Sequence, residues 1–242
     1  MNMRSDTRGS DIPNAPSGFR SRSALAALGA VGLLVGAAGH VSAASGGFAP
    51  YFAGYVAAPS AGIASASATF KVPTVNCSDG NSWSQSWGVF LEGDSLAPDA
   101  FAYVDAACDG TMDSDYYFAL DAAGNGVDDP GASPGDTVVV SAWQTTSIVE
   151  AEVHDLTNHD YWFANASPAS PGEAAYFGDQ NPDGGISPFT TVTFTKCQIN
   201  GDYLGFESPI QYSEKTGRDT QISTGKLGSP GDTFKLTFKH ES

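Results

Sequence analysis

Alternation between hydrophobic and polar residues is the dominant pattern along this chain. In the stretch Ala64–Val72, alanines, Phe70 and Val72 occupy every second position, while serine, threonine and lysine fill the positions between them. A period of two places one face of a β-strand in a core and the other face in water. Glycine, proline, serine, asparagine and aspartate interrupt such runs about every ten residues, which is typical of an all-β sandwich or barrel.

Runs rich in Val, Thr, Phe, Tyr and Trp predict strands from residue 52 onward, and almost no stretch indicates a helix. The expected strands are Phe52–Ala57, Ile63–Val72, Ser84–Glu92, Ala100–Ala106, Tyr116–Asp121, Thr137–Thr145, Ile148–Asp155, Tyr161–Ala166, Thr190–Lys196, Ile210–Ser213 and Thr233–Lys239. No linker or low-complexity stretch divides them. We therefore expect one all-β domain in this part of the chain.

The N-terminal segment has the pattern of a secretory signal peptide. Arg20 and Arg22 precede the apolar run Ala24–Ala38, and small residues follow at Val41-Ser-Ala43. A basic start, a short apolar core and small residues at the cleavage position define this signal. The run is shorter than the roughly 20 residues that a membrane-spanning helix needs. We expect residues 1–43 to be removed and residues 44–242 to form a secreted, monomeric domain without a membrane anchor.

The chain of 242 residues is strongly acidic, with a formal net charge of −16 at pH 7. Loss of residues 1–43 removes four arginines and two aspartates and leaves 25 acidic and 7 basic residues, a net charge of −18. Such a surface repels phosphate backbones, so we expect no nucleic-acid partner. It suits an acidic medium, in which protonation of carboxylates relieves their mutual repulsion, and it serves solubility equally well.

Three cysteines, Cys77, Cys108 and Cys197, remain in the expected mature chain. Export implies an oxidising compartment, in which three cysteines give one disulfide and one leftover thiol. Cys77 and Cys108 are the preferred pair, because each closes a strand-like run and a long loop lies between them.

A series of short motifs follows the order of a known family. They are Gly54-Tyr-Val-Ala57, Val72-Pro-Thr-Val75 before Cys77, Ser86-Trp87 leading to Glu92-Gly93, Cys108, Ser133-Pro-Gly-Asp-Thr137, Leu156-Thr-Asn158, Phe189–Phe194 and Phe234–Phe238. In this order they resemble the eqolisins, the secreted glutamic peptidases, over nearly the whole expected mature chain. The resemblance implies a concanavalin-A-like sandwich of two antiparallel sheets, with a groove on the concave face.

The resemblance also implies a chemistry for which this chain lacks the residues. In the family a glutamate acts as general base on a water molecule, and a glutamine amide stabilises the oxyanion. The glutamine position falls near Phe101 or Tyr103, in a segment without glutamine. The glutamate position falls on Gly178, or on Phe177 with a slip of one residue. Both catalytic positions are therefore expected to be substituted.

Neighbouring residues offer weak substitutes for the missing pair. Glu173 and Asp179 flank the glutamate position, and Gln85 lies near the tryptophan strand. On a regular strand, however, an odd offset from Gly178 turns a side chain to the opposite face. The residues that we expect to line the groove and contact a substrate are Trp87, Glu92, Tyr103 and Asp121.

Two functions stay open at this point, one enzymatic and one not. The first is a secreted glutamic-type endopeptidase that acts on polypeptides at acidic pH, with altered or absent catalysis. The alternative is a non-catalytic β-sandwich module that binds a peptide or a carbohydrate. Neither requires a cofactor or a metal. His154–Asp160 is explained more simply as an exposed turn than as a zinc site, and Asp105–Asp129 as solvated turns than as calcium loops.

Overall fold

The computed structural model describes residues 47–49, 51–78, 82–93, 99–166, 172–181, 185–216 and 219–240. All of them belong to one compact unit, Val35–Ser242. The expected signal peptide, residues 1–43, lies outside the described residues. No helix in the described part is long and apolar enough to cross a membrane.

The described residues are all-β, as the alternation predicts, apart from a short 3₁₀ helix at Leu204–Glu207. The strands are β1 Gly47–Ala49, β2 Phe52–Ala57, β3 Ser65–Lys71, β4 Ser82–Glu92, β5 Ala100–Asp109, β6 Ser114–Ala122, β7 Asn125–Asp129, β8 Thr137–Gln144, β9 Val149–Asp155, β10 Asp160–Ala166, β11 Ala174–Gln180, β12 Val192–Ile199, β13 Asp202–Tyr203, β14 Ile210–Thr216, β15 Asp219–Thr224 and β16 Phe234–Phe238. Apart from β1, which runs parallel to β14, neighbouring strands are antiparallel.

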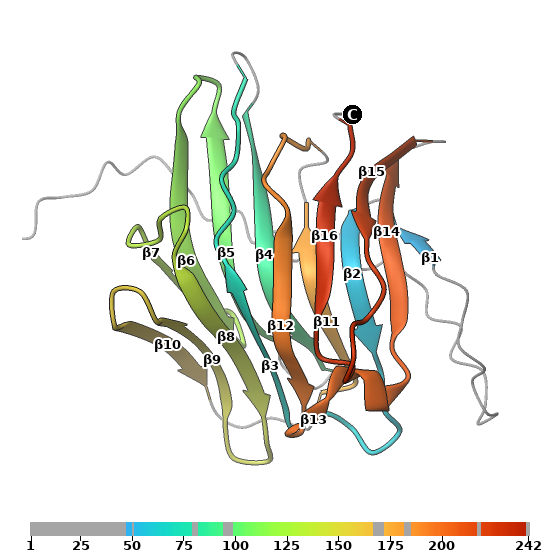
Figure 1. The fold of residues 1–242 in the computed structure, drawn as a ribbon. Helices are drawn as coiled ribbons and strands as arrows, with labels where there is room; N and C mark the ends of the chain where they lie inside the picture. Colours follow the sequence, from blue (N-terminus) through green and yellow to red (C-terminus); the bar gives the residue numbers. More distant parts are fainter. Residues whose placement is uncertain are drawn as a thin grey trace, which may run out of the picture. The chain divides into compact units, whose positions relative to one another are not determined.

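The strands form one continuous path that folds over into two packed layers (Figure 1). One layer has the order β10-β9-β8-β3-β12, and the path continues through β16, β15 and β14 to the second layer, β2-β11-β4-β5-β6-β7. Strands β5 and β6 pack against β8 and β9 across the interior. This is the predicted sandwich of two antiparallel sheets.

Five strands were not predicted from the sequence. Two of them, β1 and β13, have only three and two residues, and the other three lack the alternation on which the prediction rested. Strand β11 reads AAYFGDQ and is buried at every position except the last, because it is covered on both faces. Strand β7, NGVDD, is polar and almost fully exposed. Strand β15, DTQIST, contains a single aliphatic side chain, Ile222. A period of two appears only where one face is buried and the other is wet.

The main core lies between the two layers and is rich in aromatic rings. Phe194 stacks on Phe234 with 4.9 Å between ring centroids, and Phe118 lies 4.3 Å from Trp162 of the opposite layer. Each fully buried phenylalanine contributes roughly 1.5–3 kcal/mol of transfer free energy. The alternation predicted for β3 is observed, since Ala66, Ala68 and Phe70 are buried and the residues between them are not.

The preferred cysteine pair is confirmed. Cys77 and Cys108 form a disulfide with a Cα–Cα distance of 5.7 Å, which joins the segment after β3 to the end of β5. The Tyr116 hydroxyl lies in the same region and accepts a hydrogen bond from the Val75 backbone N–H at 2.8 Å. Cys197 is a free thiol on β12 and is fully buried, so it is inaccessible to a second chain in the folded protein.

Candidate functional site

Strand β11 presents its side chains to two different environments. Phe177 belongs to the core between the layers, and Asp179 lies on the same side of the strand two residues later. Tyr176 belongs instead to a second, smaller hydrophobic cluster on the opposite side of the strand, together with Phe52 and Phe90. We call that side, which is turned away from the main core, the outer face. Gly178 lies in register with the outer face, because strand positions alternate.

The positions that the resemblance assigns to the catalytic pair lie in one row across the outer face. Gly178 is opposite Gly54 on β2 and Gly88 on β4, and Gly88 is in turn opposite Tyr103 on β5. The register thus brings Gly178 and Tyr103 into the same row, with Gly88 between them. Phe101, the other position proposed for the glutamine, lies in the next row, opposite Phe90.

The backbone at the centre of this row excludes any side chain. Gly54 has φ of 153° and Gly178 has φ of 156°, values that residues with a Cβ atom rarely adopt. A Cβ atom on Gly178 would lie 2.1 Å from the Ala53 carbonyl oxygen, and one on Gly54 would lie 2.0 Å from the Phe177 carbonyl oxygen. These partners are backbone atoms of neighbouring strands and cannot rotate away. A carboxylate therefore has no place at position 178.

Aromatic rings from the adjacent rows flank the glycines. Phe52 and Tyr176 stand on either side of the Gly54–Gly178 pair and make an edge-to-face contact at 5.6 Å. Phe90 and Tyr103 stack at 5.5 Å on the other side of β11. Phe52, Phe90 and Tyr176 are each at most 8% exposed. Aromatic side chains stabilise glycines in a sheet by packing over them, so the centre of the outer face is a packed hydrophobic layer.

Glu92 ends β4 beside this layer and is engaged by a tyrosine. The Tyr176 hydroxyl donates a hydrogen bond to Glu92 Oε2 at 2.7 Å. Burial raises the pKa of Glu92, the bond from Tyr176 lowers it, and the nearby Asp99 carboxylate raises it again. Burial also raises the pKa of Asp99, which accepts a hydrogen bond from the Gly93 N–H at 3.1 Å. Two acids thus share this edge of the outer face.

Three other residues that the sequence nominated for the groove or the catalytic pair lie far apart or face the core. Trp87 is fully buried in the main core and does not face outward, so the groove role expected for it does not fit its position. Gln85 is also fully buried, on the core side of β4. Glu173 is exposed and lies beside Glu92 at the other end of β4, because its backbone N–H donates to the Glu92 carbonyl oxygen. Seven strand residues, about 23 Å, separate Gln85 from Glu92. Glu173 and Gln85 therefore do not form a pair.

Another group of outward residues on β5, β6 and β7 contains two residues that the sequence nominated for the groove, Tyr103 and Asp121, and four that it did not. We call it the acidic face; its members are Tyr103, Asp105, Asp115, Tyr117, Asp121 and Asp128. Strands β4 to β7 contain no lysine or arginine. A signal was present, because Asp115, Tyr117 and Asp121 fall on odd-numbered positions of one strand.

Electrostatics show that the members of the acidic face are neighbours. Burial raises the pKa of the Tyr103 hydroxyl, and the carboxylates of Asp105, Asp128 and Asp121 raise it further. Burial likewise raises the pKa of Asp128, and Asp121 adds to that effect. Neighbouring like charges disfavour ionisation in this way. The acidic face therefore suits a positively charged ligand.

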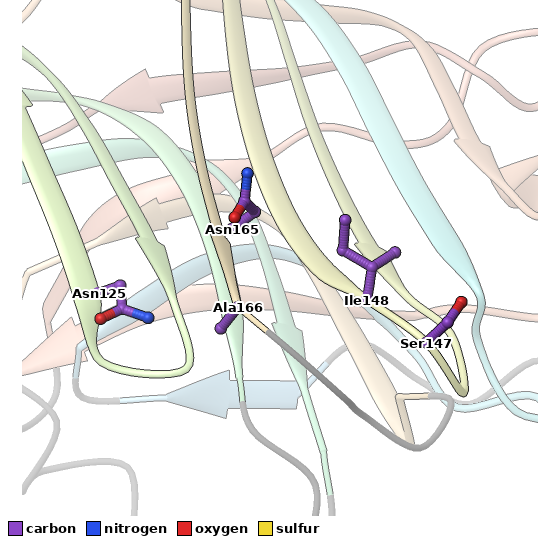
Figure 2. A pocket seen from close by; sticks show the side chains of 5 residues that line it. All are labelled: Asn125, Ser147, Ile148, Asn165 and Ala166. Carbon is purple, nitrogen blue, oxygen red and sulfur yellow. The ribbon is translucent and has the colours of Figure 1, made fainter.

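A shallow pocket lies elsewhere, at the ends of several strands. Figure 2 shows its lining, which consists of Asn125, Ser147, Ile148, Asn165 and Ala166. None of these side chains titrates in the physiological range, and none belongs to the central row of the outer face. This pocket offers no acid–base chemistry.

Comparison with known proteins places the fold. No protein-family model and no curated protein matches the chain. Scytalido-glutamic peptidase, solved with a transition-state-analogue inhibitor, matches with a TM-score of 0.61 and 16% identity over 78% of this chain and 98% of that chain. SCP-B, an eqolisin solved in complex with the tripeptide Ala-Ile-His, matches with the same TM-score, identity and coverage. The chain has the fold of the eqolisin peptidases.

Within this fold, the outer face of the chain carries a row of mostly small and aromatic residues. The row through Gly178 consists of Asp128, Ala119, Tyr103, Gly88, Gly178, Gly54 and Tyr212. Its one carboxylate, Asp128, is on β7, four strands away from Gly178, and none of these side chains is an amide. The resemblance inferred from the motifs is confirmed for the fold.

Proposed function

We propose that this protein is an exported binding module with the eqolisin fold, which holds polypeptide without hydrolysing it. The row through Gly178 is the observation that carries the proposal. Hydrolysis by the family chemistry needs a carboxylate that removes a proton from water. Tyr103 can donate a hydrogen bond to an oxyanion, but glycine cannot accept a proton. The binding function is therefore better supported than the peptidase function.

The acidic face points to a polypeptide segment that carries lysine or arginine. Tyr103 and Tyr117 provide ring surfaces, and Asp105, Asp115 and Asp128 provide carboxylates around them. Cationic side chains bind carboxylates by charge-assisted hydrogen bonds and aromatic faces by cation–π contacts. A neutral carbohydrate would gain ring contacts but would not relieve the mutual repulsion of the carboxylates. Charge thus favours a peptide ligand over the carbohydrate alternative.

Two further observations agree with a polypeptide ligand. The SCP-B structure of the same fold contains a bound tripeptide, which is a property of that protein and motivates the proposal here. The charge of −18 expected for the exported chain attracts cations over several ångströms and speeds their encounter. Protonation of Asp128 and its neighbours at acidic pH removes that attraction. Binding should therefore weaken at low pH, unlike the activity of an acid peptidase.

Fluorescence polarisation with short labelled peptides tests the proposal. A peptide rich in lysine and arginine should bind at neutral pH, and a matched peptide of glutamate and aspartate should not. The double variant Asp115→Asn/Asp128→Asn should weaken binding by about tenfold, because each partly exposed ion pair contributes up to about 1 kcal/mol. Raised salt should weaken the wild-type complex in the same direction.

A control variant distinguishes an effect of the acidic face on binding from an effect of the protein's net charge. The variant Asp160→Asn/Asp202→Asn removes the same number of charges at exposed positions on β10 and β13, and it should bind like the wild type. Equal loss in both double variants would reduce the effect to net charge and overturn the assigned surface. Binding of a neutral oligosaccharide together with failure to bind the cationic peptide would favour the carbohydrate alternative.

A further inference from the structure

Four polar side chains meet inside the sandwich near the end of β11. Asp179 and Asn181 come from β11 and the residue after it, Gln85 from β4 and Glu214 from β14. Gln85, Asp179 and Asn181 are 0% exposed, and Glu214 is 1% exposed. Their surroundings are apolar, since Asp179 is opposite Trp87 on the core side of the sheet. We call these four residues the core cluster.

The core cluster has too few internal partners for its polar atoms. The Asp179 and Glu214 carboxylates are close enough to repel each other, the Gln85 amide lies against Asp179, and the Asn181 amide lies against Glu214. Yet both Asp179 oxygens, Glu214 Oε2 and all the amide atoms of Gln85 and Asn181 lack a hydrogen-bond partner of normal geometry. Native proteins leave very few buried polar groups unsatisfied. A bound cation would supply the partner that the oxygen atoms of this set lack.

We propose that the core cluster binds one calcium ion. Calcium takes six to eight oxygen ligands from carboxylates and from the carbonyl groups of asparagine and glutamine. The two carboxylates and the two amide oxygens offer up to six such ligands. The two negative charges of Asp179 and Glu214 match the charge of the ion. Buried charges of one sign are otherwise expensive in an apolar interior.

Other occupants fit this set of residues less well. Magnesium dehydrates reluctantly and usually keeps several water molecules, which a fully buried site disfavours. Zinc prefers nitrogen and sulfur ligands, and among the described residues no group of three or more His, Cys, Asp or Glu side chains could hold a metal ion. A proton shared by Asp179 and Glu214 would relieve their repulsion, but it would leave the amide oxygens of Gln85 and Asn181 without partners.

Thermal unfolding of protein refolded in calcium or in EGTA tests the proposal. At a hundredfold excess over the dissociation constant, calcium should raise the midpoint by about 5–10 °C, and magnesium at the same concentration should not. Terbium gives a direct readout, because it occupies calcium sites and luminesces when a nearby tryptophan absorbs light. Trp87 lies beside the cluster, so excitation of tryptophan should sensitise bound terbium.

Three variants decide between calcium and a shared proton. Asp179→Asn should abolish the calcium shift, and Gln85→Met, which keeps both carboxylates, should reduce it clearly. The matched control Asp202→Asn, at an exposed position, should keep the full shift. If Asp179→Asn does not fold, Gln85→Met carries the test. The proposal is overturned by a wild type without a calcium shift or terbium luminescence, or by a shift that survives unchanged in the folded cluster variants.

Discussion

Replacing Gly178 by alanine should destabilise the protein by about 3–5 kcal/mol. A Cβ atom at this position would lie 2.1 Å from the Ala53 carbonyl oxygen, and the φ of 156° is unfavourable for any residue with a side chain. Overpacking costs about 1–3 kcal/mol, and a residue held in a rarely populated backbone region costs about as much again. Urea unfolding followed by tryptophan fluorescence measures the change.

Gly126→Ala on β7 is the matched control for this substitution. Its Cβ atom would meet Asp121 Oδ2 at 3.7 Å, an ordinary contact, and the position is exposed. We expect a change within about 0.5 kcal/mol of zero. Gly178→Glu, which restores the carboxylate of the family, should be at least as destabilising as Gly178→Ala and should not create a peptidase. A stable, proteolytically active Gly178→Glu protein would refute the close approach of the glycine strands.

In EGTA, the protein should lose stability as the pH rises from about 4.5 to about 8. Burial raises the pKa of Glu214 to about 8 from 4.5, and burial and the Glu214 charge raise the pKa of Asp179. The folded state therefore binds protons that the unfolded state has already released, so stability is full below pH 4.5 and falls toward pH 8. For Glu214 alone the span corresponds to roughly 5 kcal/mol.

The variant Asp179→Asn isolates the contribution of the buried pair. Glu92, Asp99 and Asp128 shift in the same direction as Glu214, so the wild-type slope alone does not identify its source. Asp179→Asn removes a group whose pKa burial and the Glu214 charge raise, so it should flatten the dependence on pH. Urea titrations at three pH values between 4.5 and 8 measure both slopes. Equal slopes in the two proteins, or wild-type stability that rises over this range, would contradict the role of the pair.

Much of the fold could be predicted from the local pattern of hydrophobic and polar residues. Strands with one wet face, such as β3, were predictable because hydrophobic residues recur at every second position. Strand β2 was predicted with its observed bounds, Phe52–Ala57. In the Ser-Pro-Gly-Asp turn before β8, Gly135 has φ of 97°, as Pro-Gly turns favour, and the Asp136 N–H donates to the Ser133 carbonyl at 3.1 Å. The same sequence before β16 differs, because its Ser229–Pro230 peptide is cis.

The site was less predictable, because it depends on register between strands that are distant in sequence. Nothing local to Gly178 shows that it lies opposite Gly54, more than a hundred residues earlier. The burial of Trp87 on the core side of β4 likewise follows from which face the partner layer covers. The core cluster combines residues from β4, β11 and β14, and no spacing in the sequence connects Gln85 with Glu214. Tertiary pairing decided these features.

Mass spectrometry of one peptide, bound and then released, tests binding without hydrolysis most directly. A cationic peptide is incubated with the purified protein from acidic to neutral pH, and each sample is measured under native and under denaturing conditions. We predict the mass of an intact complex at neutral pH, loss of the complex at acidic pH, and uncleaved peptide at every pH. Peptide fragments that accumulate in proportion to the protein at any pH would contradict the account.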